Sequence, residues 1–139
     1  FFDFLPFDIG KINGYTAKIQ LYTVPGQVKY NATRRLVLRG VDGIVFVADS
    51  MAVRREKNIL SLKNLQENLA NYKKSIFRIP CVIQYNKADL FEQGIPLLPT
   101  DLLEKDLNSQ LKRPSFKASA LKGTNVVTTL KKIISMTVA

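Results

Sequence analysis

The stretch Asn86-Lys87-Ala88-Asp89 has the residue types and spacing best suited to ligand chemistry. It follows directly on the apolar run that begins at Cys81, a run of the kind that forms a strand buried inside a sheet. The carboxylate of Asp89 can accept two hydrogen bonds from the N1–H and 2-amino groups of guanine, a donor pair that adenine lacks. Asn86 would then hold the base edge and the neighbouring loop, and the stem of Lys87 would lie along the ring plane. The alternative is an Asx-type turn, in which Asn86 and Asp89 bind only nearby backbone groups.

Two other predicted strand ends carry groups of similar use, namely Thr23-Val24-Pro25-Gly26-Gln27 and Ser119-Ala120. The exposed N–H of Gly26 can meet a terminal phosphate, and Gln27 can orient an attacking water. Ser119 and Ala120 are small, so their backbone N–H groups can approach a base. Each motif alone also fits an ordinary turn. Their order and spacing together favour one ligand at the carboxyl ends of the strands, where parallel sheets bind ligands.

The elements that must position these residues are an opening hairpin and then alternating strands and helices. Asn13-Gly14 is a strong hairpin signal because a type I′ turn needs positive φ at both central residues. The pattern predicts strands at 1–9, 15–23, 43–49, 81–86 and 115–119, and helices at 31–39, at 54–74, after Asp101 and from 124 onward. This order predicts one α/β domain over residues 1–139, a mostly parallel sheet between two layers of helices with one antiparallel hairpin.

The same pattern predicts several local details. The run 43–49 is nearly continuous in apolar residues, which predicts a strand buried on both faces. Asp101 is expected to cap a helix, with Glu104 at the third helical position. Helical spacing predicts the buried stripes of the last two helices, Leu103, Leu107 and Leu111 in one and Val126, Val127, Leu130, Ile133 and Ile134 in the other.

Composition excludes several kinds of site. The 139 residues contain no His, which excludes His-based catalysis and imidazole metal ligands within this chain. Cys81 is the single cysteine, so an internal disulfide and a Cys-rich zinc site are excluded and a reducing, cytoplasmic compartment is favoured. No apolar run approaches the ~20 residues that a membrane-spanning helix needs, and we expect no stable membrane insertion.

The charge balance is strongly basic, with 21 Lys and Arg against 11 Asp and Glu, a formal net charge of +10. The basic residues are spread along the chain, and most Tyr and Phe fall in predicted strands, where we expect them in the core. Proteins that bind single-stranded nucleic acid combine basic and aromatic side chains on one face. We therefore do not expect nucleic-acid binding, and solvated faces and acidic protein partners account better for the charge.

Taken together, the three motifs resemble the third, fourth and fifth nucleotide motifs of the Ras-superfamily small GTPases. More narrowly they resemble the MglA group, the bacterial GTPases of gliding motility and cell polarity, in which T-V-P-G-Q replaces the more common D-x-x-G-Q. Similarity extends to residues 1–6, 38–50 and 64–69, so it covers essentially the whole chain. The resemblance implies the three-layer sandwich of a P-loop GTPase, with GTP or GDP and Mg²⁺ as ligands.

The resemblance also implies roles on the base side of such a ligand. Asn86 and Asp89 would bind guanine, and Lys87 would pack on the base. Ser119 and Ala120 would support the base from the next loop.

On the phosphate side, the resemblance implies that Gly26 contacts the γ-phosphate and that Gln27 positions the hydrolytic water. Thr23 stands where the family has an Asp and would reach Mg²⁺ through a metal-bound water, with a weaker field than a carboxylate supplies. Residues 24–35 would form the second switch, which changes shape when the γ-phosphate leaves.

The chain departs from the resemblance at its beginning. It contains no G-x-x-x-x-G-K-[ST] stretch, and the first switch is absent as well. The missing part is a strand, the P-loop and a helix, on the order of 30 residues. We therefore expect an N-terminally truncated G domain that is inactive alone and belongs to a longer chain. Without that strand, we expect apolar residues such as Ile44 and Val82 to be poorly covered.

The function implied is a GTP-binding and GTP-hydrolysing switch in bacterial cell polarity or motility. Its implied partners are a Roadblock-domain GTPase-activating protein and polarity effectors, and its implied place is the cytoplasm, with recruitment to a cell pole. The alternative is a nucleotide-free pseudo-GTPase that acts as a protein-interaction module.

Overall fold

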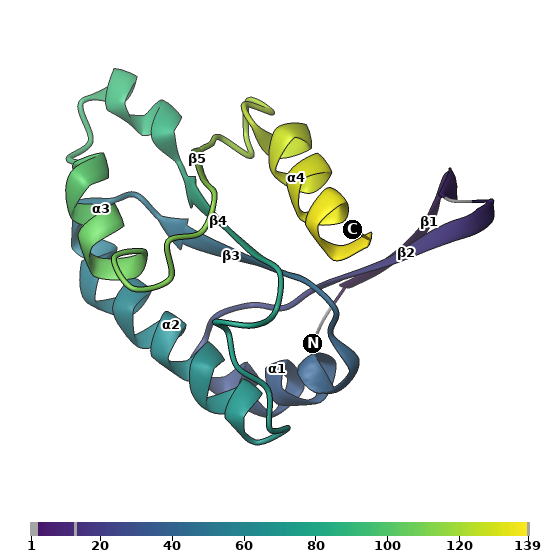
Figure 1. Ribbon diagram of the computed structural model, residues 1–139. Coiled ribbons are helices and arrows are strands. Elements are labelled where there is room, and N and C mark those ends of the chain that lie inside the picture. Colours follow the sequence, from purple (N-terminus) through teal and green to yellow (C-terminus); the bar gives the residue numbers. More distant parts are fainter. Residues whose placement is uncertain (1–2, 13, 139) are drawn as a thin grey trace. The chain divides into compact units, whose positions relative to one another are not determined.

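The computed structural model describes residues 3–12 and 14–138 of the chain. These residues form two compact units, one that extends to Gly40 and one that begins at Val41. Figure 1 shows their elements along the chain. We describe each unit by itself.

The first unit is a β-hairpin followed by a short helix. Strands β1 (Asp3–Ile12) and β2 (Tyr15–Thr23) pair antiparallel, with a bulge between Asp8 and Gly10. The predicted hairpin is thereby confirmed. Of the turn, Asn13 lies outside the described residues, as do Phe1 and Phe2 of the first strand, whereas Gly14 adopts a left-handed φ of +83°. After β2 the chain forms short 3₁₀ turns at Val28–Tyr30 and Leu38–Gly40 that flank α1 (Asn31–Val37).

The second unit is a three-stranded parallel sheet with helices on both faces. Its elements are β3 (Ile44–Asp49), α2 (Arg55–Ala70), β4 (Cys81–Asn86), α3 (Thr100–Leu107), β5 (Ser115–Lys117) and α4 (Val126–Val138), with 3₁₀ turns at Ala52–Arg54 and Ala88–Gln93. The strand order is β3-β4-β5. In Figure 1, α4 covers one face of the sheet and α2 and α3 cover the other. The predicted three-layer α/β class, mostly parallel with one antiparallel hairpin, is confirmed.

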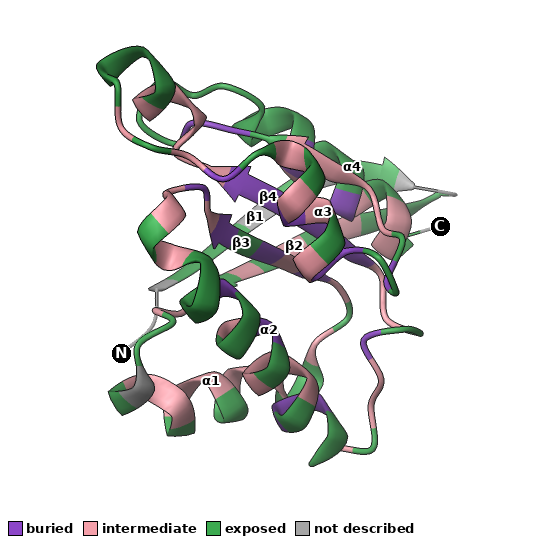
Figure 2. Ribbon diagram, turned by 90° about the vertical axis from the view of Figure 1, so that its left-hand side faces the viewer, coloured by how far each residue is buried: buried purple, intermediate pink, exposed green. Residues whose placement is uncertain are grey.

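The core of this unit centres on β4. Residues 81–85 of this strand are all buried, as Figure 2 shows by colour. Ile44 and Val82 are 8% and 0% exposed, so the expectation that they would be poorly covered is wrong. The reason lies in α4, which packs so closely on the start of β3 that a Cβ at Gly43 would meet Ile133 and Thr137.

Burial along β3 alternates, which corrects the prediction of a strand buried on both faces. Ile44, Phe46 and Ala48 are buried, whereas Val47 is 52% exposed. Within the second unit β3 is an edge strand with one paired neighbour, and its second face is only partly covered.

Two helix predictions need correction. Helix α3 begins at Thr100 after Pro99, and no side chain caps it, so Asp101 lies in the first turn instead of at the cap. Val126 and Val127 of α4 are 38% and 59% exposed, because the helix faces the sheet with Thr129 and Ile133. The leucine stripe of the earlier helix is buried as predicted, at Leu103, Leu107 and Leu111.

The expectation that aromatic side chains lie in the core holds for only some of them. Phe46 and Tyr85 are buried, but Phe4, Tyr15 and Tyr22, in the predicted hairpin strands, are exposed. Among the residues that the structure describes, no helix has the length and apolar character needed to cross a membrane.

Candidate functional site

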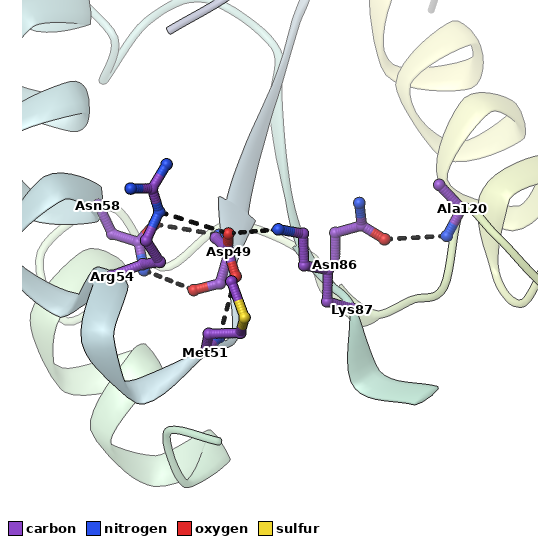
Figure 3. A network of polar contacts seen from close by, with 7 residues as sticks. All are labelled: Asp49, Met51, Arg54, Asn58, Asn86, Lys87 and Ala120. Carbon is purple, nitrogen blue, oxygen red and sulfur yellow. Dashed lines mark hydrogen bonds and ion pairs between the residues drawn. The ribbon is translucent and has the colours of Figure 1, made fainter. Parts of the chain in front are cut away.

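Two consecutive residues at the end of β4 reach the ends of both neighbouring strands (Figure 3). The Oδ1 of Asn86 accepts a hydrogen bond of 2.9 Å from the backbone N–H of Ala120, in the loop after β5. The Nζ of Lys87 donates a 2.8 Å hydrogen bond to Oδ2 of Asp49, the last residue of β3. The motif is therefore fixed from two sides by side-chain contacts.

Parallel register explains why these groups meet. Asp49 lies opposite Asn86 in the β3–β4 pair, so Lys87 emerges beside the end of β3. The backbone N–H of Ser50 donates to the carbonyl of Asn86 at 3.1 Å, which continues the pairing by one residue. Polar side chains at the carboxyl ends of neighbouring strands thus lie at one edge of the sheet.

Asp49 is itself held by its surroundings. Its Oδ1 accepts from the backbone N–H of Met51 at 3.0 Å. Asn58 of α2 donates from Nδ2 to the backbone carbonyl of Asp49 at 2.8 Å and accepts from its backbone N–H at 3.0 Å. The Nε of Arg54 lies 3.6 Å from Oδ2, a longer contact than that of Lys87. Figure 3 shows these contacts converging on Asp49, with Asn58 on its backbone and Met51, Arg54 and Lys87 on its carboxylate.

The turn after β4 places Asp89 beside these residues. Lys87 adopts a left-handed φ of +69°, and the N–H of Ala88 then donates to the carbonyl of Ala118 at 3.0 Å. For a residue that has a Cβ, the left-handed conformation is roughly 1–2 kcal/mol less favourable than the right-handed one. Here the tight turn and the contacts on both sides maintain it, and the 3₁₀ turn Ala88–Gln93 follows.

The loop after β5 is built around Ser119, which is 2% exposed. Its Oγ accepts from the N–H of Lys122 at 3.1 Å, and its own N–H donates to the carbonyl of Thr124 at 3.1 Å. Ser119 thereby shapes the loop from which the Ala120 N–H points to Asn86. The Nζ of Lys122 pairs with Glu92 at 2.9 Å, and this hydrogen bond raises the pKa of Lys122.

A pocket of about 260 Å³ lies at this edge and is lined by Asn86, Lys87, Asp89, Leu90 and Leu121. Sites for drug-sized ligands span ~300–1,000 Å³, so this pocket suits one heterocyclic group better than a whole nucleotide. Within the part of the chain that the structure describes, the carboxylate of Asp89 accepts no hydrogen bond and Nδ2 of Asn86 donates none. The pocket therefore offers the two carboxylate oxygens of Asp89 as acceptors and Nδ2 of Asn86 as a donor. Leu90, Leu121 and the aliphatic stem of Lys87 also line it.

Thr23, Gly26 and Gln27 belong to the first unit. Thr23 ends β2 opposite Asp3, and Gly26 and Gln27 are exposed in the segment that follows. Arg34 fixes this segment, since its Nη1 donates to the carbonyls of Pro25 and Gln27 at 2.8 and 2.6 Å. The structure thus brings Asn86, Lys87, Asp89 and Ala120 together, with Ser119 behind them, and describes the other three predicted site residues in their own unit.

A metal ion would need more than these residues supply. Among residues 3–12 and 14–138 no three His, Cys, Asp or Glu side chains cluster as metal ligands. Thr23 offers a neutral hydroxyl, which can reach a metal ion only through a bound water. The described residues therefore supply no cage of protein ligands, and a Mg²⁺ ion would take most of its ligands from nucleotide phosphates and water.

Sequence reasoning missed the two residues that organise the site around Lys87. Asp49 was noted as a strand end, but no partner was assigned to it, and Asn58 was not singled out at all. The available signal was the parallel register, which places the end of one strand beside the residue that follows the end of the next.

Comparison with known proteins identifies the family of the chain. The model of the Ras family matches residues 3–138. The Mutual gliding-motility protein MglA of Myxococcus xanthus (strain DK1622) is 46% identical over 136 residues, which cover 98% of this chain and 67% of that protein. Both matches take in the hairpin, the sheet and the pocket-lining residues described above. The chain therefore belongs to the Ras family of small GTPases.

Proposed function

We propose that this chain forms the guanine-binding part of a GTP-hydrolysing switch. The observation that carries the proposal is the pocket at the carboxyl edge of the sheet, where Asn86, Lys87 and Asp89 line one cavity and Ala120 is hydrogen-bonded to Asn86. Members of the Ras family bind GTP or GDP together with Mg²⁺, and this family membership supports a guanine nucleotide as the ligand.

Base recognition follows from the groups that face the pocket. The two carboxylate oxygens of Asp89 accept from the N1–H and 2-amino groups of guanine, and both donors are lacking on adenine. The Nδ2 of Asn86 is available to an acceptor on the base, while its Oδ1 stays with Ala120. The aliphatic stem of Lys87 packs along the ring, and the loop of Ser119 and Ala120 closes the same side.

Phosphate chemistry is assigned to the segment after β2. The N–H of Gly26 contacts the γ-phosphate, and the Gln27 side chain orients the water that attacks it. Arg34 supports both roles because it holds the carbonyls of Pro25 and Gln27 and so fixes the path of the backbone. Mg²⁺ bound with the nucleotide would neutralise charge on the phosphates, and we assign Thr23 to the contact with a metal-bound water.

The name of the relative suggests the process. We propose that the switch acts in gliding motility, the process for which the Myxococcus protein is named. We further propose that the switch controls cell polarity. Its partners would be a Roadblock-domain GTPase-activating protein and polarity effectors. It would act in the cytoplasm, with recruitment to a cell pole. Basic side chains over much of the chain favour acidic partner surfaces.

Substitution of Asp89 tests the base-recognition step. In the protein at its natural full length, Asp89→Ala should abolish the preference for GDP over ADP while circular dichroism stays unchanged. Asp101→Ala is the matched control, since Asp101 is an exposed carboxylate in the first turn of α3. Titration with fluorescent GDP and ADP measures both. Guanine preference that survives Asp89→Ala would contradict the proposal.

Substitution of Gln27 tests the hydrolysis step separately. Gln27→Leu should slow GTP hydrolysis by on the order of a hundredfold or more, because the water loses its orienting group, and should leave GTP affinity within about twofold. Single-turnover hydrolysis and GTP titration distinguish the two effects. Unchanged turnover would remove Gln27 from the mechanism without affecting the role of Asp89.

A further inference from the structure

The proposed function gives Asp49 no part, although it is the most connected carboxylate near the pocket. It contacts Met51, Arg54, Asn58 and Lys87, and its side chain is 19% exposed. It does not line the cavity. Its side chain meets a cavity-lining residue through the 2.8 Å hydrogen bond from Nζ of Lys87, and its backbone lies opposite Asn86 in the β3–β4 pair.

Lys87 is held at both ends. Its backbone is fixed in the left-handed region at φ +69°, and its ammonium group is fixed on Oδ2 of Asp49. A free lysine side chain has many rotamers, and fixing it on binding a ligand carries an unfavourable entropy. In this structure Lys87 lines the pocket while its ammonium group is held on Asp49.

The anchor for Lys87 is rigid. The carboxylate of Asp49 is held through Oδ1 by the Met51 N–H, and its backbone is held at both N–H and carbonyl by Asn58. Asp49 therefore cannot follow Lys87 if the lysine moves. Arg54 competes weakly for the same oxygen, because its distance is 3.6 Å and 43% of its side chain is exposed.

We propose that Asp49 is a positioning residue of the base pocket, which pre-orders the stem of Lys87 as a wall for the ring to pack against. Asp49 thereby sets how tightly a purine nucleotide is held, whereas the choice of guanine belongs to Asp89. The inference rests on the proposed function, because the ligand whose base meets this wall is the guanine nucleotide.

A double-mutant cycle tests this role in the protein at its natural full length. The variants are Asp49→Asn, Lys87→Met and the two combined, because Met keeps an unbranched stem and removes the charge. Asp106→Asn is the matched control, since Asp106 also forms a 2.8 Å ion pair, with Arg55, and does not line the base pocket. The readouts are GDP affinity, the GDP/ADP preference, and urea unfolding without nucleotide.

The expected result is that Asp49→Asn weakens GDP binding about fivefold and leaves the GDP/ADP preference unchanged. In the Lys87→Met background the same substitution should have no further effect, because the group it acts through is gone. Asp106→Asn should leave GDP affinity unchanged. Unfolding without nucleotide should show the same non-additivity between Asp49 and Lys87.

Three results would overturn the inference. One is an equal loss of GDP affinity from Asp49→Asn with and without Lys87→Met, which would assign Asp49 to the backbone around Met51 and Asn58 instead. Another is unchanged GDP affinity in Asp49→Asn. The third is that the changes in the free energy of unfolding caused by Asp49→Asn and Lys87→Met add up in the double variant, which would show that the two side chains do not interact. A protein that binds no GDP before any substitution contradicts the proposed function, and the unfolding cycle then still decides on the Asp49–Lys87 contact.

Discussion

Glu104 of α3 joins three elements of the second unit through one carboxylate, and its removal gives a quantitative test of the core. Its Oε1 accepts from the hydroxyl of Tyr85 at 3.1 Å and from the hydroxyl of Ser115, and its Oε2 accepts from Nδ2 of Asn108 at 2.8 Å. Burial raises the pKa of Tyr85, and the charge of Glu104 raises it further. The phenol therefore stays protonated and donates at neutral pH.

The magnitude follows from what each donor does once Glu104→Ala removes the carboxylate. Asn108 keeps an acceptor, the carbonyl of Arg113 at 2.9 Å, and Ser115 is only half-buried and can reach water. Tyr85 is 1% exposed and loses its charged acceptor, with only the hydroxyl of Ser115 left beside it. An orphaned buried hydroxyl costs about 1–3 kcal/mol, and two weakened hydrogen bonds add about 0.5–1.5 kcal/mol each. We expect a loss of about 3 kcal/mol in the free energy of unfolding.

Tyr85→Phe supplies the decisive comparison. Alone it should cost only about 1 kcal/mol, because Glu104 keeps its other two donors. Combined with Glu104→Ala it should restore about 1 kcal/mol relative to Glu104→Ala alone, since no hydroxyl is then left orphaned in the core. Urea unfolding of the three variants with unchanged slope measures these differences. The reasoning would be refuted if the free energy of unfolding of the double variant were lower than that of Glu104→Ala by the same amount that Tyr85→Phe costs alone.

Two further predictions concern titrating groups. Burial raises the pKa of Cys81 to about 11, and its side chain is 0% exposed. At pH 8 a thiol reagent should therefore label Cys81 on the order of a hundredfold or more slower in the folded protein than in urea. Similar labelling rates in both would contradict this. The hydrogen bond from Arg55 lowers the pKa of Asp106 below its ordinary value. The ion pair therefore stabilises the folded state fully at pH values above the unfolded-state pKa of ~3.9, and this stabilisation is lost as the pH falls through the lower pKa of the folded state. Asp106→Asn should therefore lower the urea midpoint more at pH 6 than at pH 2.5, and an equal difference at both pH values would count against the ion pair.

The parts of the fold that are local in sequence could be predicted. The hairpin is signalled by Asn13-Gly14 and by the alternation in β2, where Ala17, Ile19 and Leu21 are indeed less exposed than their neighbours. Strand β4 has the predicted bounds, because an uninterrupted apolar run bounded by Pro80 and by a polar motif has few other solutions. The family resemblance, carried by three short motifs, is confirmed by the match over residues 3–138.

What failed depends on contacts between distant residues. Asp101 has the chemistry of a helix cap, but Pro99 sets the entry into α3, and Glu104 is drawn to Tyr85 and Ser115 instead of to its own helix end. Val126 and Val127 are apolar, yet the side of α4 that meets the sheet carries Thr129, whose hydroxyl accepts from Nε2 of Gln84 at 3.0 Å. A buried polar pair of this kind leaves no periodic signal in the sequence.

The same limit applies to the site. Asn86, Lys87 and Asp89 were found because they are adjacent in the chain, whereas the ion pair of Lys87 with Asp49 joins residues on different strands. Register decides that contact, and register is set by the whole sheet. The pocket wall at Leu121 was missed for the same reason, since an exposed leucine in a loop has no distinguishing neighbours in sequence.

The two hydrogen bonds of Asn58 have a mechanical consequence for α2. A side-chain amide offers one donor and one acceptor, as a peptide group does, so Asn58 meets the backbone of Asp49 much as a residue of an adjoining strand would. An Asp at this position would offer acceptors only, and an Ala would offer nothing. Since one residue of helix rises about 1.5 Å, sliding α2 by a single residue along β3 would break both bonds. These two hydrogen bonds therefore couple the position of α2 along the sheet to the end of β3, where Asp49 meets Lys87.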